Sequence, residues 1–290
     1  MDIAIGLPGL IPGTEASTVL EWARRAEARG FHSLVVDERL VWDGYEILIT
    51  AAAAAAVTER VRITASVVVA PLRKNVAEFA KQAASIDRLS AGRFVLGLGV
   101  GSRVDDFALS GVDLHERGRR TDALLAECRS LWTGEPAAFG PKPATAGGPS
   151  LLFGGRSPAT FRRVAEYGTG WICATSGGVD GLRSGADLLE ASWREAGREG
   201  RPRLLALTPR FALGPNGRDA VDDYVRAYNA YRGEGAEQRA TSALLTAGDV
   251  RAQFDRFAEA GCDELILNPA DPDPEQVDLL ADALADVLGG

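Results

Sequence analysis

Two adjacent carboxylates, Asp37 and Glu38, are the first candidates for chemistry, because they end a short apolar run that begins at Ser33. A carboxyl group at the end of a buried strand can donate or accept a proton, or it can anchor a substrate. Side chains alternate along a strand, so we expect one of the two to face the site and the other to point aside. A solvated carboxylate, or one paired with Arg39, is the structural alternative.

A second group of candidates follows the apolar run Leu151 to Phe153. Its residues are Gly154, Gly155, Arg156 and Ser157. Ser157 can cap a helix whose first turn holds Pro158, so free backbone N–H groups and the positive end of the helix would face the end of the strand. Such a geometry holds a phosphate, and Arg156 would add a charge-assisted contact. The alternative is a tight turn with an ordinary helix cap.

A second acidic pair, Asp105 and Asp106, offers the same choice between acid–base chemistry and an ion pair, with Arg103 as the expected partner. Neither acidic pair has a histidine beside it. The cysteines are three in number, far apart and without CxxC spacing. The sequence therefore indicates neither a metal site nor a disulfide framework.

The element that positions these residues is most visible between Val61 and Gly101. Arg62 to Ala70 is a run of small and β-branched residues, typical of a strand that is buried on both faces. From Asn75 to Ser90 the apolar residues recur every three or four positions, and Gly92 suits a left-handed C-cap. Arg93 to Gly101 is a second buried strand that ends in glycines. These segments predict a parallel β-α-β unit.

The same alternation continues along the chain and predicts eight strands. Besides the two above, the candidate strands are Asp2 to Leu7, Ser33 to Asp37, Leu151 to Phe153, Gly170 to Cys173, Leu204 to Leu213 and Cys262 to Asn268. Helices are expected between them, including one through Ala28, whose start is suggested by the capping-box spacing of Thr18 and Glu21, and one from Ala220 to Tyr231.

Eight strands that alternate with helices over 290 residues favour an α/β fold, a (β/α)8 TIM barrel formed by a single domain over residues 1–290. An open doubly wound sheet is the runner-up, but no GxGxxG follows the first strand. In a barrel the active site lies at the carboxyl ends of the strands, which is where the acidic pairs and the glycine motif stand.

Composition limits the partners that we expect. The net charge is −8 and the isoelectric point is near 5.0, with no long basic run, which argues against a nucleic-acid partner. No apolar run reaches the roughly 20 residues of a membrane span, and the start of the chain has no positive n-region. We therefore expect a cytoplasmic protein with no membrane partner.

The chain also resembles the bacterial luciferase-like monooxygenase family, which includes FMN-dependent monooxygenases and reductases that use the deazaflavin coenzyme F-420. The resemblance covers almost the whole chain in order and is carried by Lys81 to Phe94 leading into Leu96 to Gly101, Gly111 to Asp113 with Arg117-Gly118, Leu131-Trp132, Gly154 to Ser157 with Gly170 to Ile172, and Ala260 to Leu265.

The resemblance implies a barrel with short insertions that holds an FMN or F-420 ring at its carboxyl end, often in a dimer. In that family a bulge with a non-prolyl cis peptide in the third strand supports the ring, and the matching residues are Ser66 and Val67. This pair looks more like the deazaflavin members. Residues that match the strand beside the ring are Gly99, Val100 and Gly101, and the phosphate contacts match Gly154, Gly155 and Ser157.

One departure concerns proton transfer. Many members carry a histidine after the acidic residue that ends the second strand, and here Glu38 follows Asp37. Glu38 can replace that histidine as an acid or base if burial raises its pKa, or the chemistry is absent.

These observations predict a flavin- or deazaflavin-dependent oxidoreductase for a small organic substrate. With FMN we expect a monooxygenase served by a separate flavin reductase, and with F-420 a hydride-transfer reductase or dehydrogenase. The competing interpretations are a non-catalytic flavin- or deazaflavin-binding barrel of the same family and a barrel that binds a phosphosugar through Gly154 to Ser157. The alanine-rich stretch Ala51 to Ala56 and the family resemblance together predict a homodimer.

Overall fold

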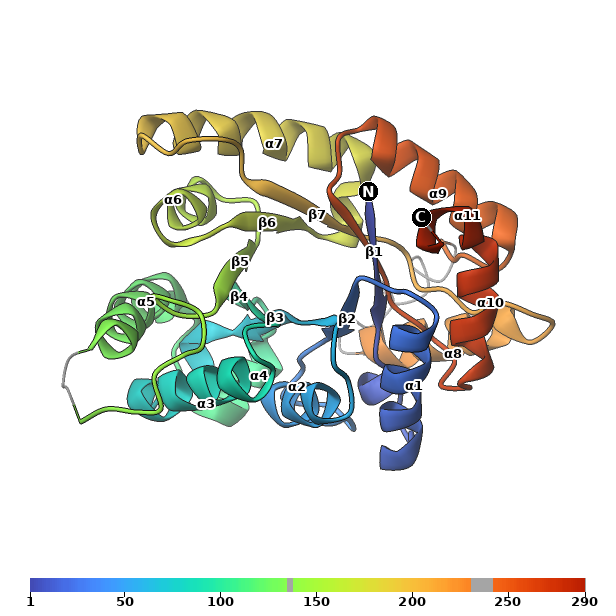
Figure 1. Ribbon diagram of the computed structural model, residues 1–290, viewed down its shortest axis with the longest axis horizontal. Helices are drawn as coiled ribbons and strands as arrows, with labels where there is room; N and C mark the ends of the chain where they lie inside the picture. Colours follow the sequence, from blue (N-terminus) through green and yellow to red (C-terminus); the bar gives the residue numbers. More distant parts are fainter. Residues whose placement is uncertain (135–137, 231–241, 290) are drawn as a thin grey trace.

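The computed structural model describes residues 1–134, 138–230 and 242–289 and shows a closed parallel barrel, with the strands in sequence order and β8 paired to β1 (Figure 1). This confirms the predicted (β/α)8 barrel and excludes the open sheet. The strands are β1 Asp2–Gly6, β2 Ser33–Val36, β3 Arg62–Val69, β4 Phe94–Gly99, β5 Ser150–Gly154, β6 Gly170–Cys173, β7 Arg203–Leu207 and β8 Glu264–Leu267.

Helices surround the barrel (Figure 1). They are α1 Ala16–Ala28, α2 Ile47–Ala56, α3 Val76–Leu89, α4 Val104–Ser110, α5 Arg117–Thr133, α6 Pro158–Tyr167, α7 Gly178–Glu195, α8 Gly217–Asn229, α9 Ala247–Glu259, α10 Glu275–Ala283 and α11 Ala285–Leu288. Among the described residues, no helix combines the length and the apolar character needed to cross a bilayer.

Three of the expected boundaries need correction. The helix that we expected to start at Thr18 begins at Ala16, after Glu15, so Thr18 lies within its first turn. The seventh strand ends at Leu207 and not at Leu213, because the chain turns away from the barrel before Pro209, which has no N–H for a ladder hydrogen bond. Helix α8 begins at Gly217, and its predicted end at Tyr231 lies outside the described residues.

Strand β3 carries the bulge that the family resemblance implied. Its register with β4 shifts between Ala65 and Val68, and the peptide bond between Ser66 and Val67 is cis. Glycines make room for the Val67 side chain: a Cβ at Gly99 would lie 2.7 Å from Val67 Cγ2, and a Cβ at Gly154 would lie 3.4 Å from Val67 Cγ1. The absence of side chains on the neighbouring strands therefore accommodates the bulged residue.

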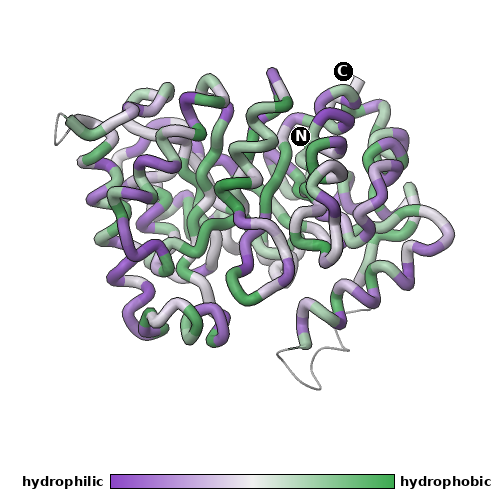
Figure 2. Tube along the Cα trace, turned by 90° about the horizontal axis from the view of Figure 1, so that it is seen from below, coloured by the Kyte–Doolittle hydropathy of each residue, from purple (hydrophilic) through white to green (hydrophobic). Residues whose placement is uncertain are grey.

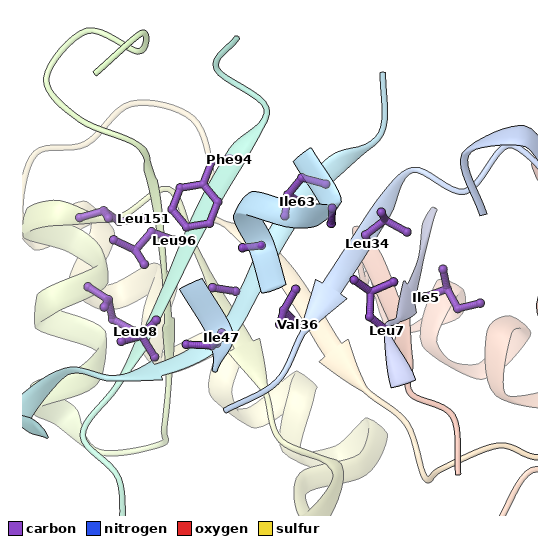
Figure 3. Packing of buried hydrophobic residues seen from close by; sticks show 14 of the residues in the cluster. Ile5, Leu7, Leu34, Val36, Ile47, Ile63, Phe94, Leu96, Leu98 and Leu151 are labelled. Atoms are coloured by element: carbon purple, nitrogen blue, oxygen red, sulfur yellow. The ribbon is translucent and has the colours of Figure 1, made fainter. Parts of the chain in front are cut away.

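The hydrophobic core has an inner and an outer part. The outer part lies between the strands and the helices, and Figure 3 shows a portion of it, with labelled side chains on β1 to β5 and Ile47 of α2 among them. The inner part fills the barrel, and its residues are Ala4, Val35, Leu152, Ile172, Leu205 and Ile266, with Val67, Val95 and Leu207 packed against them. In Figure 2 the apolar residues follow the strands, and polar residues cover most of the outer helices. The interior is therefore filled with side chains and is not a channel.

Ion pairs connect the amino ends of four strands. Glu264 of β8 lies 3.0 Å from Arg203 of β7 and 3.8 Å from Arg62 of β3, and both arginines also contact Asp2 of β1. The Glu264 side chain is only 2% exposed, whereas the arginines are 33% and 40% exposed. This network fixes the end of the barrel opposite the predicted site.

We expect Glu264→Ala to lower the free energy of unfolding by about 2 kcal/mol, because it leaves two guanidinium groups without their buried partner. Partial exposure of the arginines keeps the loss below that of a fully buried pair. Urea denaturation measures the change. Asp282→Ala is the matched control, because Asp282 is 69% exposed and contacts Arg29 at the surface. Equal losses in the two variants would contradict the role given to Glu264.

Candidate active site

A cavity of about 580 Å³ opens at the carboxyl ends of the strands. Its lining comes from the ends of β2, β3, β6, β7 and β8, from the segment between β4 and α4, and from α8. The volume falls within the range of small-molecule and cofactor sites. The predicted residues Asp37, Glu38, Ser66, Val67 and Gly101 all line this cavity.

Asp37 follows β2 and forms a largely buried ion pair across the barrel. Arg210, which follows β7, donates from Nη2 to Asp37 Oδ2 over 2.9 Å, and Asn268 Nδ2 lies 3.4 Å from Asp37 Oδ1. Burial raises the pKa of the Asp37 carboxyl group, and the nearby Arg210 opposes that increase. Asp37 is therefore a carboxylate whose proton affinity depends on its partner.

Glu38 also lines the cavity, so the expectation that only one of the two carboxylates would face the site is wrong. The pair lies beyond the last residue of β2, Val36, where strand alternation no longer applies. Glu38 accepts a hydrogen bond from the backbone N–H of Val69 and pairs with Arg73. Burial raises the pKa of the Glu38 carboxyl group, with Arg73 acting in the opposite direction. Glu38 thus connects the end of β2 to the end of β3.

The acidic pair after β4 is also engaged. Arg103 donates from Nη2 to Asp105 Oδ2 over 2.6 Å, as the sequence suggested, and Arg39 Nη2 lies 3.6 Å from the same oxygen. Asp106 lines the cavity and accepts a hydrogen bond from the backbone N–H of Val41 over 2.8 Å. Asp105 and Asp106 therefore connect the β4–α4 segment to the loop after β2.

Helix α8 supplies an aromatic wall that the sequence analysis missed. Tyr224 and Tyr228 are stacked with their ring centres 5.6 Å apart, and Trp42 meets Tyr228 edge-on at 5.4 Å. The Arg39 guanidinium lies over Trp42 at 4.4 Å and over Tyr228 at 4.7 Å, and that of Arg210 lies over Tyr224 at 4.5 Å. Tyrosines four residues apart on one helix were a visible signal, but their partners are distant in sequence.

The bulged strand forms part of the opposite wall. Val67 presents an apolar surface, and the adjacent Ser66 is 8% exposed with a hydroxyl oxygen that has no hydrogen-bond partner within the described protein. The same holds for Asn268 Oδ1 and for the Tyr224 hydroxyl, each on another residue that lines the cavity. Buried polar atoms without partners are rare in proteins, so their position here indicates a site for a ligand.

The three residues that were predicted to lie beside the FMN or F-420 ring, Gly99, Val100 and Gly101, differ in their environments. Gly99 is buried against Val67, Val100 is half-buried and does not line the cavity, and Gly101 lines it. Gly101 has a φ of +69°, and a Cβ there would lie 2.6 Å from Val69 Cγ1. The chain can therefore turn from β4 close to the end of β3 only with glycine at this position.

The glycine motif after β5 lies beside the cavity lining and not within it. Ser157 caps α6 as predicted, since its side chain accepts a hydrogen bond from the backbone N–H of Thr160. Arg156 extends toward the start of α7, where a Cβ at Gly181 would lie 3.5 Å from its Cζ. The residues just before α7, Thr175 and Ser176, line the cavity. The amino ends of two helices, with one arginine between them, therefore lie next to the cavity.

These features fit a flat aromatic cofactor with a phosphate. The apolar Val67 and the close edge at Gly101 suit a ring, and the unpartnered Ser66 and Asn268 atoms suit its polar margin. The exposed Gly155 to Ser157 segment suits an anion. Within residues 1–134, 138–230 and 242–289, no three side chains of His, Cys, Asp or Glu converge in a way that would hold a metal ion.

Comparisons with known proteins agree with this geometry. A family model described as luciferase-like monooxygenase matches residues 5–287. An uncharacterised protein of Mycobacterium tuberculosis, Rv0953c, is 33% identical over 167 residues, which are 53% of this chain and 58% of that protein. An F420-dependent glucose-6-phosphate dehydrogenase of Kribbella flavida is 26% identical over 319 residues, or 95% of both chains.

Solved structures share the fold. An F420-dependent secondary alcohol dehydrogenase in complex with an F420-acetone adduct has a TM-score of 0.79 at 19% identity and covers 99% of this chain and 98% of its own. The monooxygenase RslO1 from Streptomyces bottropensis has a TM-score of 0.78 at 22% identity over 99% of both chains. At these identities the likeness concerns the barrel alone.

Proposed function

The chain belongs to the luciferase-like monooxygenase family, and from that premise we propose that it is an oxidoreductase that binds coenzyme F-420 at the barrel mouth and acts by hydride transfer on an organic substrate. The observation that carries the proposal is the cavity between the Ser66–Val67 bulge and the aromatic wall of α8. The match over 95% of both chains to a protein named for F420 dependence supports the choice of coenzyme.

When bound, the coenzyme supplies a ring carbon that gives or takes a hydride, and the protein supplies orientation and proton transfer. Val67 supports the ring, and Ser66 gives a hydroxyl for its polar margin. Gly101 forms the edge beside the ring, while Gly99 leaves room for Val67 and Val100 lies outside the cavity lining. Each of these assignments is part of the proposal.

Asp37 is the residue that we propose to hold or release the proton at the substrate oxygen. It lines the cavity, burial raises the pKa of its carboxyl group, and Arg210 stabilises its charged form. Glu38 shares the high degree of burial, but its carboxylate binds Arg73 and the backbone N–H of Val69. We therefore propose that Glu38 positions the bulged strand, and that Asp37 carries out the proton transfer that the family histidine would otherwise provide.

Gly154, Gly155, Arg156 and Ser157 are proposed to bind the coenzyme phosphate. We expect Arg156→Met to raise the Kd for F-420 about tenfold, because one charge-assisted contact is lost while the helix end remains. Fluorescence titration measures the change. Arg162→Met is the matched control, since Arg162 is exposed on α6, the helix that follows Arg156, and its replacement removes the same charge. Equal affinity in the two variants would place the phosphate elsewhere.

Two further features are proposed on the same basis. A homodimer is proposed through the exposed edge of α2, where Ile49 is 69% exposed beside the alanine-rich stretch. A cytoplasmic location is proposed together with a separate enzyme that returns the coenzyme to its starting redox state. Light scattering at micromolar concentration tests the dimer, and a monomeric mass would refute it.

Titration with F-420 and, separately, with FMN tests the proposed function. We expect the fluorescence of F-420 to change at micromolar coenzyme and FMN to bind at least tenfold more weakly. Preferential binding of FMN would replace the proposal by a monooxygenase. If neither F-420 nor FMN binds, the proposed function is wrong. Binding of F-420 without its reduction by any alcohol, and without oxidation of reduced F-420 by any carbonyl compound, would favour the non-catalytic alternative.

A further inference from the structure

The charges around the cavity are balanced. Among the described residues, each lining carboxylate has a guanidinium partner, and Asp105 adds a fourth pair just behind the lining. The pairs are Asp37 with Arg210, Glu38 with Arg73, Asp106 with Arg103, and Asp105 with Arg39, at nitrogen–oxygen separations of up to 3.9 Å. No lysine stands among the described lining residues. The described part of the cavity wall therefore offers an anionic group no surplus positive charge.

The lining is also unusually polar. Eight of its side chains carry a hydroxyl group and two carry an amide, whereas small-molecule sites are mostly apolar. Three of their atoms, Ser66 Oγ, the Tyr224 hydroxyl oxygen and Asn268 Oδ1, have no hydrogen-bond partner within the described protein. Burial raises the pKa of the Tyr224 hydroxyl, so it remains a donor at neutral pH. The cavity lining therefore has both hydrogen-bond donors and acceptors for a ligand that itself donates and accepts.

We propose that the substrate is an uncharged, hydroxyl-rich molecule, a polyol or a sugar without phosphate or carboxylate. The proposal rests on the proposed function, in which the coenzyme occupies the side of the cavity nearest Val67. The substrate then faces α8 and the β4–α4 segment. Alcohol groups, which both donate and accept hydrogen bonds, match the unpartnered oxygen atoms of Ser66, Tyr224 and Asn268.

The two neighbouring ligand classes fit less well. A phosphorylated sugar, the substrate named for the Kribbella flavida relative, would have to compete with a carboxylate for a guanidinium that is already paired. An apolar alcohol would leave the unpartnered hydroxyl and amide groups without hydrogen bonds. Sites built to hydrogen-bond hydroxyl groups reject analogues that lack them by large factors.

Ligand-observed NMR and thermal shift, read with and without F-420, test the proposal on matched compounds. The probes are glucose and glucose 6-phosphate, myo-inositol and inositol 1-phosphate, and ribitol and ribitol 5-phosphate, with cyclohexanol as the apolar alcohol. We expect the neutral member of the best-bound pair to bind at least tenfold more tightly than its phosphate and than cyclohexanol. A tighter phosphate, a tighter cyclohexanol, or no polyol binding at 50 mM would overturn the proposal.

The two proposals fail separately. If F-420 does not bind, the proposed function fails, while polyol binding to the coenzyme-free protein still decides the substrate class. If F-420 binds and the phosphates are preferred, only the substrate class is wrong.

A charge variant sharpens the test. Asp105→Asn removes the carboxylate shared by Arg39 and Arg103 and leaves a surplus positive charge beside the cavity. We expect the ratio of phosphate to neutral affinity to rise about tenfold. Asp187→Asn is the control, because Asp187 is exposed on α7 and changes the net charge equally. A ratio that moves equally in both variants, or in neither, would contradict charge balance as the source of selectivity.

Discussion

Replacing Gly97 by alanine is expected to lower the free energy of unfolding by about 3 kcal/mol. A Cβ at this position would lie 2.2 Å from the carbonyl oxygen of Ala65, and a backbone atom in a barrel strand cannot move aside as a side chain does. Urea denaturation measures the loss. The affinity for F-420 should fall as well, because Ala65, whose carbonyl would be displaced, lies two residues before Val67 in β3.

Gly248→Ala is the matched control for this substitution. Gly248 lies in the first turn of α9, and a Cβ there would meet nothing closer than Thr246 Oγ1 at 3.6 Å. We expect a change within about 0.5 kcal/mol, in the stabilising direction, because alanine favours a helix. A loss in Gly248→Ala as large as in Gly97→Ala would show that the close approach to Ala65 is not the cause.

Gly99 provides a second check on the bulge, because its contact is with a side chain. Gly99→Ala alone should lower the free energy of unfolding, because its Cβ would lie 2.7 Å from Val67 Cγ2. Val67→Ala removes that atom, so the double variant should lose less stability than the sum of the two single variants. Additive losses in the double variant would refute the fit between Val67 and the glycines.

Asp37→Asn is expected to reduce turnover about 100-fold while the Kd for F-420 changes less than twofold. The amide keeps the shape of the side chain but neither accepts nor releases the proton. Pre-steady-state reduction of bound F-420 measures the step directly. The control is Glu38→Gln, which should lower coenzyme affinity more than the rate if Glu38 positions β3. Equal rates in Asp37→Asn and the unmodified protein would remove Asp37 from the chemistry.

The stability of the same variant has a predictable dependence on pH. Burial raises the pKa of Asp37, so the folded state binds this proton more tightly than the unfolded state does. The corresponding stability is present below the ordinary aspartate pKa of about 4 and is lost as the pH rises through the raised value. Asp37→Asn has no titrating carboxyl group at this position, so it does not lose this stability. Urea midpoints should therefore shift in favour of the variant as the pH rises above about 4, and a constant difference would contradict the raised pKa.

The barrel was predictable because local patterns determine its parts. Runs of β-branched residues, amphipathic helices and the Ser157 cap are each visible within a few residues, and the structure contains all of them. The predicted boundaries of helices and strands were wrong where two local sequence signals competed. The capping-box spacing at Thr18 was present, but the helix begins one turn earlier after Glu15, which makes no side-chain cap.

The site was only partly predictable because it is assembled from distant segments. Asp37 was recognised as a candidate, but its partner Arg210 lies 173 residues away, and no local pattern links them. The tyrosines of α8 were likewise not identified, since their role depends on contacts with Trp42 and Arg39 after the barrel closes. Helix α4 was missed because it has only seven residues, too few for a periodic pattern.

The edge-on contacts of Trp42 with the α8 tyrosines, together with the Arg39 guanidinium over its ring, give the protein its own optical reporter. Of the five tryptophans, Trp22, Trp132, Trp171 and Trp193 are at most 5% exposed within the helical layer or the barrel wall, far from solvent. Trp42 alone is partly exposed, and it contacts two residues that line the cavity. A ligand that enters the mouth changes the surroundings of the Trp42 indole. The indoles of Trp22, Trp132 and Trp193 bind backbone carbonyls of residues outside the cavity lining and serve as an internal standard, so intrinsic emission can follow occupancy without any label.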